Sequence, residues 1–317
     1  MNISKIVELG LWPESKKTTT QKGIAELEDQ GYNLFYIGKN ADLYTCPGDE
    51  AKVLLVRSDR CSVFDIPLNL EIEGKGVSQT AISNNGAAFA KESGIKTAIL
   101  DETINSSLSI APRCQFMELC KPLEAEIDGD VVQFEFIFRN YLTGSLYDAC
   151  QNGNDPYGLE LTSDLPQWHK FETPIFTPTT KGIKDEPLNS AVVRKQFPEI
   201  ISSMEKLFKD YTQFALDNGI VIVDTKFEIF INSKGEWVLG DEVLTPESSR
   251  FISKEDFDSQ NYISMDKQIL RDFGKSENWK EKAKALAAGE KLEVNVPQEI
   301  KDKILSGYTT ILNRLSK

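Results

Sequence analysis

The chain has 317 residues, 40% of them hydrophobic and 27% charged, which is typical of a soluble globular protein with one large domain or two lobes. It contains 36 Lys and Arg against 49 Asp and Glu, a formal net charge of −13. Binding to nucleic acid or to an anionic membrane needs basic surface, so this charge argues against both kinds of partner.

The cysteines, the single histidine and the distribution of apolar residues argue against further kinds of protein and site. The five cysteines are scattered without a CxxC pair, which is typical of reduced thiols in the cytosol. His169 is the single histidine, so a His-rich zinc site is excluded and a Ser–His triad has no supporting motif. No secretory leader is recognisable, and no apolar run approaches the roughly 18–20 residues of a membrane helix. These features predict a cytoplasmic protein.

The first part of the chain is rich in predicted β-structure. Residues 33–68 alternate short β-prone runs with turn signals, as in an antiparallel sheet. Residues 78–94 predict a helix that ends at Gly94. The elements expected next are strands over 97–102 and 114–123 and a hairpin over 125–140 whose turn is Asp128-Gly129.

The second part mixes irregular, helical and strand patterns. Residues 152–189 are polar and Pro-rich, which predicts an irregular segment long enough to be functional. Residues 190–219 follow a helical period that ends at Gly219, and 296–315 predict a final helix with an apolar packing stripe. The apolar stripe expected within 190–219 consists of Ile200, Met204, Phe208, Tyr211 and Ala215. The pattern predicts an α+β fold with a small β-rich lobe to about Pro122 and a larger mixed lobe after it.

The stretch "GIVIVDTKFEIFINSKGEWVLGDE" (219–242) predicts a hairpin that carries unexpected charge. Because side chains alternate across a strand, the apolar residues face a core while Asp224, Lys226 and Glu228 share the other face. If residues 232–235 form a four-residue loop, Lys226 lies opposite Asp241. Glu228 is then diagonal to Asp241, with about 7–8 Å between their backbones.

Two interpretations of this charged face are open at this point. Glu228 and Asp241 can converge on a divalent cation, and hard oxygen ligands without nearby His or Cys suit Mg²⁺. The face can instead be a solvated surface joined by salt bridges of Lys226. From the spacing alone the second interpretation is favoured, since charge networks of this kind are common.

Other stretches offer groups that bind anions. In "FIFRNYLTGS", Ser145 is expected at a helix N-terminus, where a phosphate is stabilised, and Arg139 can add charge-assisted hydrogen bonds. An ordinary helix cap and a surface arginine are the alternative. Lys181 and Asp185 fall in an irregular segment that suits either a substrate loop or a solvated loop. Arg250 follows the metal candidates, and Lys39 in "IGKNADLY" is a weak phosphate signal.

Taken together, these stretches resemble the SAICAR synthetase (phosphoribosylaminoimidazole-succinocarboxamide synthase) family, ligases of purine biosynthesis. The resemblance spans 38–273. It implies a kinase-like or ATP-grasp-like β-rich lobe over 1–122, a larger substrate- and metal-binding α+β lobe over 123–317, and an active site between them. The matching blocks occur in the family's order: "GKNADLY", "SDRCSVFD", "FRNYLTGS", "FTPTTK" with "KDEPLN", "GIVIVDTKFEIF", "LGDEVLTPESSRF" and "DKQILRDF".

The resemblance implies an activity and a role for each candidate residue. Such enzymes join the carboxylate of carboxyaminoimidazole ribonucleotide (CAIR) to the amine of L-aspartate through an acyl phosphate, converting ATP to ADP and phosphate. The implied roles are Lys226 and Asp224 in catalysis, Glu228 and Asp241 as Mg²⁺ ligands, Lys39 on ATP, Arg139, Ser145 and Arg250 on the 5′-phosphate, Asp65 near the imidazole, and Lys181 and Asp185 in aspartate binding.

Three features depart from the family pattern. The segment between Leu119 and Phe134 is longer than usual, so the adenine-contacting residues are not assigned. Ala41 stands where the family commonly has a second basic residue, which bears on how the triphosphate is held. Residues 1–35 extend beyond a minimal member and are expected either to pack on the ATP lobe or to mediate association, so a homo-oligomer is one alternative. The competing functions are an ATP-dependent kinase or ligase acting on another phosphorylated metabolite, and an inactive nucleotide-binding homologue.

Overall fold

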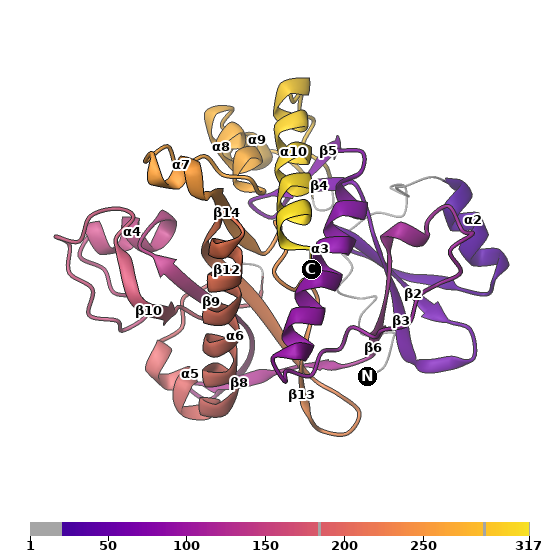
Figure 1. Ribbon diagram of the computed structural model, residues 1–317, viewed down its shortest axis with the longest axis horizontal. Coiled ribbons are helices and arrows are strands. Elements are labelled where there is room, and N and C mark those ends of the chain that lie inside the picture. Colours follow the sequence, from indigo (N-terminus) through magenta and orange to yellow (C-terminus); the bar gives the residue numbers. More distant parts are fainter. Residues whose placement is uncertain (1–20, 183–184, 288–289, 317) are drawn as a thin grey trace. The chain divides into compact units, whose positions relative to one another are not determined.

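The computed structural model describes residues 21–182, 185–287 and 290–316 (Figure 1). Most of the predicted N-terminal extension therefore lies outside the described residues. The chain divides into two compact units, and the division departs from the two continuous lobes predicted from the sequence. The first unit comprises Met1–Asn85, Ala98–Cys120 and Ser264–Lys317, and the second Gly86–Thr97 and Lys121–Ile263.

An antiparallel sheet forms one part of the first unit, as predicted. Its strand order is β1 (Asn33–Ile37), β2 (Ala41–Cys46), β3 (Asp49–Arg57), β6 (Cys114–Glu118). Leu27 of helix α2 (Gln21–Asp29) packs in one hydrophobic core with three residues of the sheet, Tyr44, Leu54 and Phe116. The strand predicted over 97–102 is wrong, because this segment forms only isolated bridges such as Ile99 with Met117.

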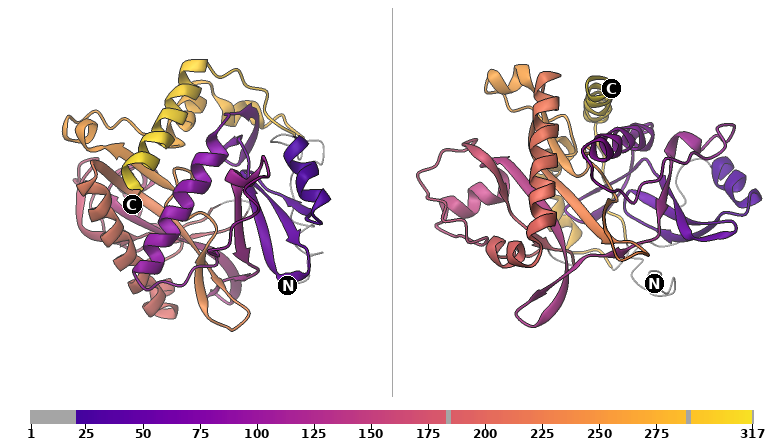
Figure 2. Two further views of the ribbon diagram at one scale, coloured as in Figure 1. Left: turned by 45° about the vertical axis from the view of Figure 1, so that its right-hand side comes forward. Right: turned by 60° about the horizontal axis from the view of Figure 1, so that its bottom comes forward.

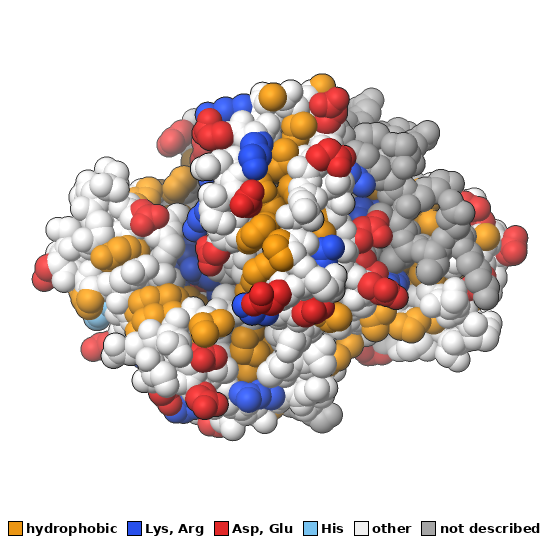
Figure 3. Space-filling view, turned by 90° about the horizontal axis from the view of Figure 1, so that it is seen from above, with side chains coloured by type: hydrophobic (Ala, Val, Ile, Leu, Met, Phe, Trp, Pro, Cys, Tyr) orange, Lys and Arg blue, Asp and Glu red, His pale blue; other side chains and the backbone are white. Residues whose placement is uncertain are grey.

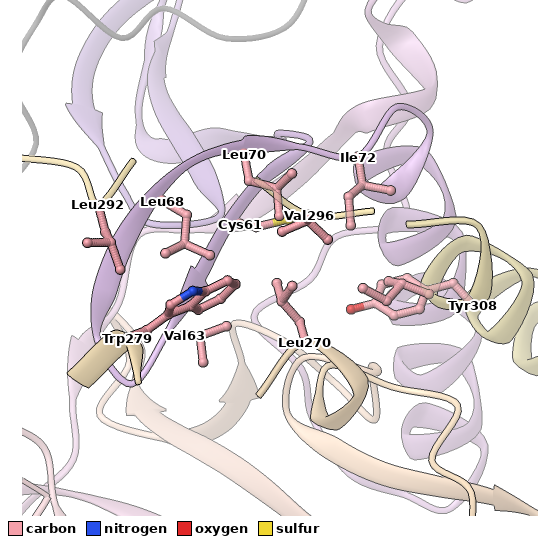
Figure 4. Packing of buried hydrophobic residues seen from close by; sticks show 11 residues of the cluster. Cys61, Val63, Leu68, Leu70, Ile72, Leu270, Trp279, Leu292, Val296 and Tyr308 are labelled. Carbon is pink, nitrogen blue, oxygen red and sulfur yellow. The ribbon is translucent and has the colours of Figure 1, made fainter. Parts of the chain in front are cut away.

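A second core explains why the C-terminal residues belong to the first unit. Leu68 and Leu70 of the β4–β5 hairpin pack on Leu270, Trp279 and Tyr308 (Figure 4). The predicted apolar stripe of the last helix is confirmed by the burial of Tyr308 and its neighbours Ile304 and Ile311. The elements are β4 (Arg60–Val63), β5 (Ile66–Glu71), α8 (Gln268–Ser276), α9 (Trp279–Ala283) and α10 (Gln298–Leu315).

Two long strands, β9 (Asp130–Tyr141) and β12 (Ile220–Ile231), pair antiparallel at the centre of the second unit's sheet. The predicted Asp128-Gly129 turn is confirmed: both residues have left-handed φ values, 52° and 92°, as a two-residue hairpin turn requires. The other strands are β7 (Lys121–Pro122), β8 (Glu124–Ile127), β10 (Lys170–Phe176), β11 (Thr179–Thr180), β13 (Trp237–Gly240) and β14 (Ser249–Ser253). Because β10 and β11 lie within 152–189, the prediction that this whole segment is irregular is wrong.

Helix α6 (Pro198–Asp217) lies along β12 in the second unit (Figure 2). Its predicted stripe is buried, and Gly219 ends it with a φ of 75°. The single helical period predicted over 190–219 is interrupted at Phe197, since Pro198 disfavours helical backbone in the residue before it. The remaining helices are η2 (Ala111–Arg113), α3 (Lys75–Glu92), α4 (Gly144–Gln151), α5 (Ser190–Gln196) and α7 (Lys254–Asp258).

The mixed α+β class with antiparallel sheets is thus confirmed. None of the helices in the described ranges combines the length and apolar character needed to cross a membrane. On the face drawn in Figure 3, acidic and basic side chains are interspersed.

The hydroxyl of Tyr211 gives a test of the packing in the second unit. Its ring meets Phe89 edge-on at 5.0 Å between centroids, and its oxygen is buried with no hydrogen-bond partner among the described residues. A buried polar group without a partner costs stability, so Tyr211→Phe is expected to raise the free energy of unfolding by about 1 kcal/mol. Urea denaturation measures this change.

Tyr211→Ala is the matched control, because it removes the ring as well and is expected to cost about 3–5 kcal/mol. A Tyr211→Phe variant less stable than the parent would show that the hydroxyl contributes a stabilising interaction.

Candidate functional site

The charged side chains of β12 lie on one face of the second unit's sheet. Asp224 and Glu228 are each 7% exposed, and the side chain of Lys226 is 35% exposed. Phe227, between them in sequence, is fully buried. The carboxylates of this face are thus largely enclosed rather than solvated, whereas the salt bridges of Lys226 expected in that interpretation are present.

Asp224 is shared by two arginines from the neighbouring strands. It faces Arg139 of β9 and Arg250 of β14 in register. Arg139 Nη1 donates to Asp224 Oδ2 at 2.9 Å, and Arg250 Nε donates to both carboxylate oxygens at 2.9 Å. Arg139 Nε also donates to Thr177 Oγ1 at 2.9 Å. These four residues, the arginine–aspartate cluster, carry two positive charges and one negative charge.

The N-terminus of α4 adjoins this cluster. Gly144 has a φ of 60°, and a Cβ built on it would lie 3.2 Å from Arg250 Nη1, so the guanidinium packs against the first turn of the helix. Ser145 follows and is exposed. Within the described chain, Thr143 makes no side-chain cap to this turn. Free N–H groups beside a guanidinium suit an anion, which is the combination predicted for Ser145 and Arg250.

Arg139 lies deeper than Arg250. Its side chain is 9% exposed, against 16% for Arg250. Burial lowers the pKa of Arg139, and the Asp224 carboxylate opposes this effect. A buried guanidinium of this kind needs its carboxylate partner, so Asp224 holds both arginines in place.

A second set of charges lies farther along β12. Lys226 Nζ donates to Glu135 Oε1 on β9 at 2.8 Å and lies 3.7 Å from Glu228 Oε1. Lys181, just after β11, donates to Glu228 Oε2. We call Glu135, Lys181, Lys226 and Glu228 the lysine–glutamate cluster. The polar contacts of Lys226 described here are therefore with these glutamates, whereas Asp224 contacts the arginines.

The pKa values of the two glutamates of this cluster are shifted in opposite directions. Burial opposes ionisation of Glu228, but Lys181 and Lys226 outweigh it and hold the pKa of Glu228 below its ordinary value. Burial raises the pKa of Glu135; Lys226 opposes that rise, and the charges of Glu228 and Asp185 add to it. Burial favours the neutral form of Lys226, yet Glu228 and Glu135 raise the pKa of this lysine overall.

Asp241 lies close to Glu228, but the strand register differs from the predicted one. Ile231 pairs with Trp237 and Glu228 with Gly240, so the loop spans five residues, 232–236, and the predicted four-residue loop is wrong. In this register a continued strand would place Asp241 opposite Phe227. Instead β13 ends at Gly240, and Asp241 adopts a left-handed φ of 54°. The Asp241 carboxyl then hydrogen-bonds to Glu228.

The Glu228–Asp241 pair fits a magnesium ion. Its two carboxyl groups already lie within hydrogen-bonding reach of each other, where both could bind one cation. In residues 21–182, 185–287 and 290–316, no group of three or more His, Cys, Asp or Glu has the arrangement of a metal site. Mg²⁺ is usually held by one or two carboxylates and completed by water and phosphate oxygens, so a pair is sufficient.

The predicted site residues of the first unit pair with each other. Lys39 follows β1 and Asp65 lies in the β4–β5 turn, where it has a left-handed φ of 61°. Lys39 Nζ lies 2.5 Å from Asp65 Oδ1, and the two side chains are 46% and 65% exposed. Ala41 begins β2, and its carbonyl accepts a hydrogen bond from Gly38 N–H at 2.8 Å.

Glu135 and two of the threonines of "FTPTTK", Thr177 and Thr179, were not among the predicted site residues. A signal for Glu135 is present in "FEFIFRN", because residues four apart on a strand share a face, which places Glu135 with Arg139. No local pattern reveals Thr177 or Thr179, since their positions depend on pairing with β9.

The opposite shifts of Glu228 and Glu135 predict opposite pH dependences of stability. A lowered pKa makes ionised Glu228 favour the folded state, so the stability difference between the parent and Glu228→Gln should shrink as pH falls below about 4.5. A raised pKa makes ionised Glu135 unfavourable, so the parent should gain stability relative to Glu135→Gln as pH falls toward about 4.5.

Urea denaturation of the three proteins between pH 3 and 8, at roughly one-unit steps, measures both trends. Parallel trends in the two variants would contradict the assignment of opposite shifts.

Comparison with known proteins shows the family to which the sequence belongs. The sequence model of the SAICAR synthetase family matches residues 34–286. The phosphoribosylaminoimidazole-succinocarboxamide synthase of Desulfotalea psychrophila is 30% identical over 301 residues, covering 90% of this chain and 95% of that protein. Its counterpart in Histophilus somni is 34% identical over 298 residues, covering 89% and 97%.

The fold has a counterpart among solved structures. The SAICAR synthase of Saccharomyces cerevisiae in complex with SAICAR has a TM-score of 0.71 and 26% identity, covering 95% of this chain and 97% of that one. The match with the family extends over most of the chain and includes both charge clusters of β12. This chain belongs to the SAICAR synthetase family.

Proposed function

We propose that this chain joins the carboxylate of CAIR to the amine of L-aspartate, with conversion of ATP to ADP and phosphate, to give SAICAR. The observation that supports this most is the placement of two charge clusters along one strand. Asp224 and Lys226, the residues of β12 at the two clusters, are two residues apart, which is about 7 Å along the strand. A ligand with a phosphate at one end and a carboxylate at the other can reach both clusters at once.

The arginine–aspartate cluster is the proposed site for the 5′-phosphate of CAIR. Arg250 and Ser145 meet at the first turn of α4, where charge-assisted hydrogen bonds and the helix N-terminus both favour a phosphate. Arg139, which is more deeply buried than Arg250, adds positive charge to this site. Asp224 acts in this arrangement as the residue that orients the two guanidinium groups, instead of taking part in the reaction beside Lys226.

The lysine–glutamate cluster is the proposed site of reaction. A carboxylate is a poor acyl donor, so its oxygen first receives the γ-phosphoryl group of ATP. Lys226 can neutralise the charge that gathers on that phosphoryl group, because its Nζ is already held between two glutamates on the sheet face. Glu228 and Asp241 would hold Mg²⁺, which supplies charge neutralisation for the phosphates when bound.

The remaining predicted residues are assigned by family position. Lys39 is proposed to contact ATP phosphates and Asp65 to lie near the imidazole, both in the first unit, which is proposed as the ATP-binding part. Lys181 and Asp185 are proposed to bind aspartate; Asp185 lies near Glu135, and Lys181 contacts Glu228. The reactants are cytoplasmic metabolites, so we propose a cytoplasmic enzyme that needs neither nucleic acid nor membrane.

Omitting one reactant at a time tests the function. With ATP, Mg²⁺, CAIR and aspartate together, the chain is expected to release ADP and form SAICAR in equal amounts. Without aspartate, ADP release should fall to a small fraction of the full rate. Steady ADP release that ignores aspartate would favour a kinase or another ligase, and ATP binding without turnover would favour an inactive homologue.

Asp241→Asn tests the magnesium assignment in the same assay. The change keeps the size of the side chain and removes its charge, so turnover at about 1 mM Mg²⁺ should fall by at least about 100-fold, because positive charge at the transferred phosphoryl group is lost. Asp258→Asn, at an exposed residue of α7 that pairs with Lys254, is the matched control and should keep parental activity. Near-parental activity of Asp241→Asn would refute the assignment.

A further inference from the structure

Glu135 is a buried carboxylate of the lysine–glutamate cluster whose one part in the function proposed above is to hold Lys226. It is 6% exposed and lies on β9, four residues before Arg139 and on the same face of the sheet. Its one described hydrogen bond is accepted from Lys226 Nζ at 2.8 Å. When an incoming carboxylate and phosphoryl group take up the hydrogen bonds of Lys226, Glu135 becomes available to another donor.

Thr179 adds an independent sign of a ligand at this place. It pairs with Glu135 in the antiparallel register of β11 and β9, so the two side chains stand on one face with Cβ atoms about 5 Å apart. Thr179 is 6% exposed, and its Oγ1 is buried without a hydrogen-bond partner among the residues described. A buried hydroxyl is costly to leave unpaired, which indicates that a bound polar group completes it.

The charge around these two residues favours a cationic donor. Glu135 lies within electrostatic reach of Asp185, Glu228 and Lys226, and Glu228 within reach of Asp241 and Lys181. With Glu228 and Asp241 offset by the Mg²⁺ that they would hold, and Lys226 turned to the phosphoryl group, two carboxylates remain beside Lys181. An ammonium group would balance this charge and could donate to both the Glu135 carboxylate and Thr179 Oγ1.

We infer that Glu135 and Thr179 bind the amino group of the amine substrate and that Glu135 accepts its proton. The inference rests on the proposed function, in which that amine is L-aspartate. Thr179 has a positioning role, because it orients the nitrogen without exchanging a proton. The raised pKa of Glu135 agrees with a carboxylate that accepts a proton more readily than an ordinary glutamate.

The proposed step balances in atoms and charge. The ammonium group passes one proton to Glu135 and becomes a nucleophilic amine. Its nitrogen forms a bond to the acyl carbon, and the carbon–oxygen bond to the phosphate breaks with its electron pair on the oxygen. The second nitrogen proton leaves with that oxygen as hydrogen phosphate, and the nitrogen keeps one proton in the amide. Glu135 then returns its proton to solvent.

Hydroxylamine separates this role from mere support of Lys226. It is uncharged at neutral pH and attacks acyl phosphates without first losing a proton, giving a hydroxamate. Glu135→Gln is expected to lower the rate of SAICAR formation by about 100-fold or more while hydroxamate formation from ATP, Mg²⁺ and CAIR falls far less. Hydroxamate formation by the variant also shows that it is folded.

The other variants define the roles of the two residues. Glu135→Asp should recover part of the rate with aspartate, and the low-pH limb of kcat/KM for aspartate should disappear in Glu135→Gln. Thr179→Val should raise KM for aspartate about tenfold with little change in kcat. Thr180→Val is the matched control, since Thr180 Oγ1 already accepts from Glu186 N–H at 2.9 Å and should not affect KM for aspartate.

Equal losses of SAICAR and hydroxamate in Glu135→Gln would overturn the inference and leave Glu135 as a residue that positions Lys226. Parental activity of Glu135→Gln with aspartate would overturn it as well. If the unmodified chain forms neither product, the proposed function itself is wrong, an outcome separate from a failure in the variants alone.

Discussion

The arrangement of the site depends on one carboxylate, Asp224, that lies between two guanidinium groups. Three adjacent strands bring Arg139, Asp224 and Arg250 into one row. Two arginines this close would repel each other, and burial adds to the cost of their charge. Asp224 offsets both effects and still leaves one net positive charge beside the first turn of α4. The row therefore leaves an unbalanced charge for an anionic ligand.

The same strand keeps two opposite chemical environments apart. At the level of Asp224, β12 carries excess positive charge, whereas around Lys226 and Glu228 the carboxylates outnumber the lysines. Asp224 and Lys226, at the centres of these environments, are two residues apart, and each contacts partners on neighbouring strands. A rigid sheet face of this kind suits catalysis by positioning, in which the protein neutralises charge without rearranging.

Much of this arrangement could be predicted from the sequence, and the exceptions have physical reasons. Alternation along β12 correctly placed Asp224, Lys226 and Glu228 on one face, because this pattern is local. The partners of Asp224 could not be predicted, since they depend on which strands pair and in which register. The sequence pattern correctly placed Asp241 near Glu228, but it did so through an incorrect strand register. Asp241 follows the end of β13 and has a left-handed backbone, so regular strand geometry does not determine its position. Thr179 became visible only through its pairing with Glu135.

Calorimetric titration with CAIR and with the same molecule lacking its 5′-phosphate tests the central claim most directly. The account predicts that the parent protein strongly prefers the phosphorylated ligand. Arg250→Ala should lose about 10- to 100-fold of that preference, the effect of charge-assisted hydrogen bonds. Lys254→Ala, at an exposed lysine in the same part of the chain, should keep it. Equal affinity of the parent for both ligands, or an unchanged preference in Arg250→Ala, would contradict the account.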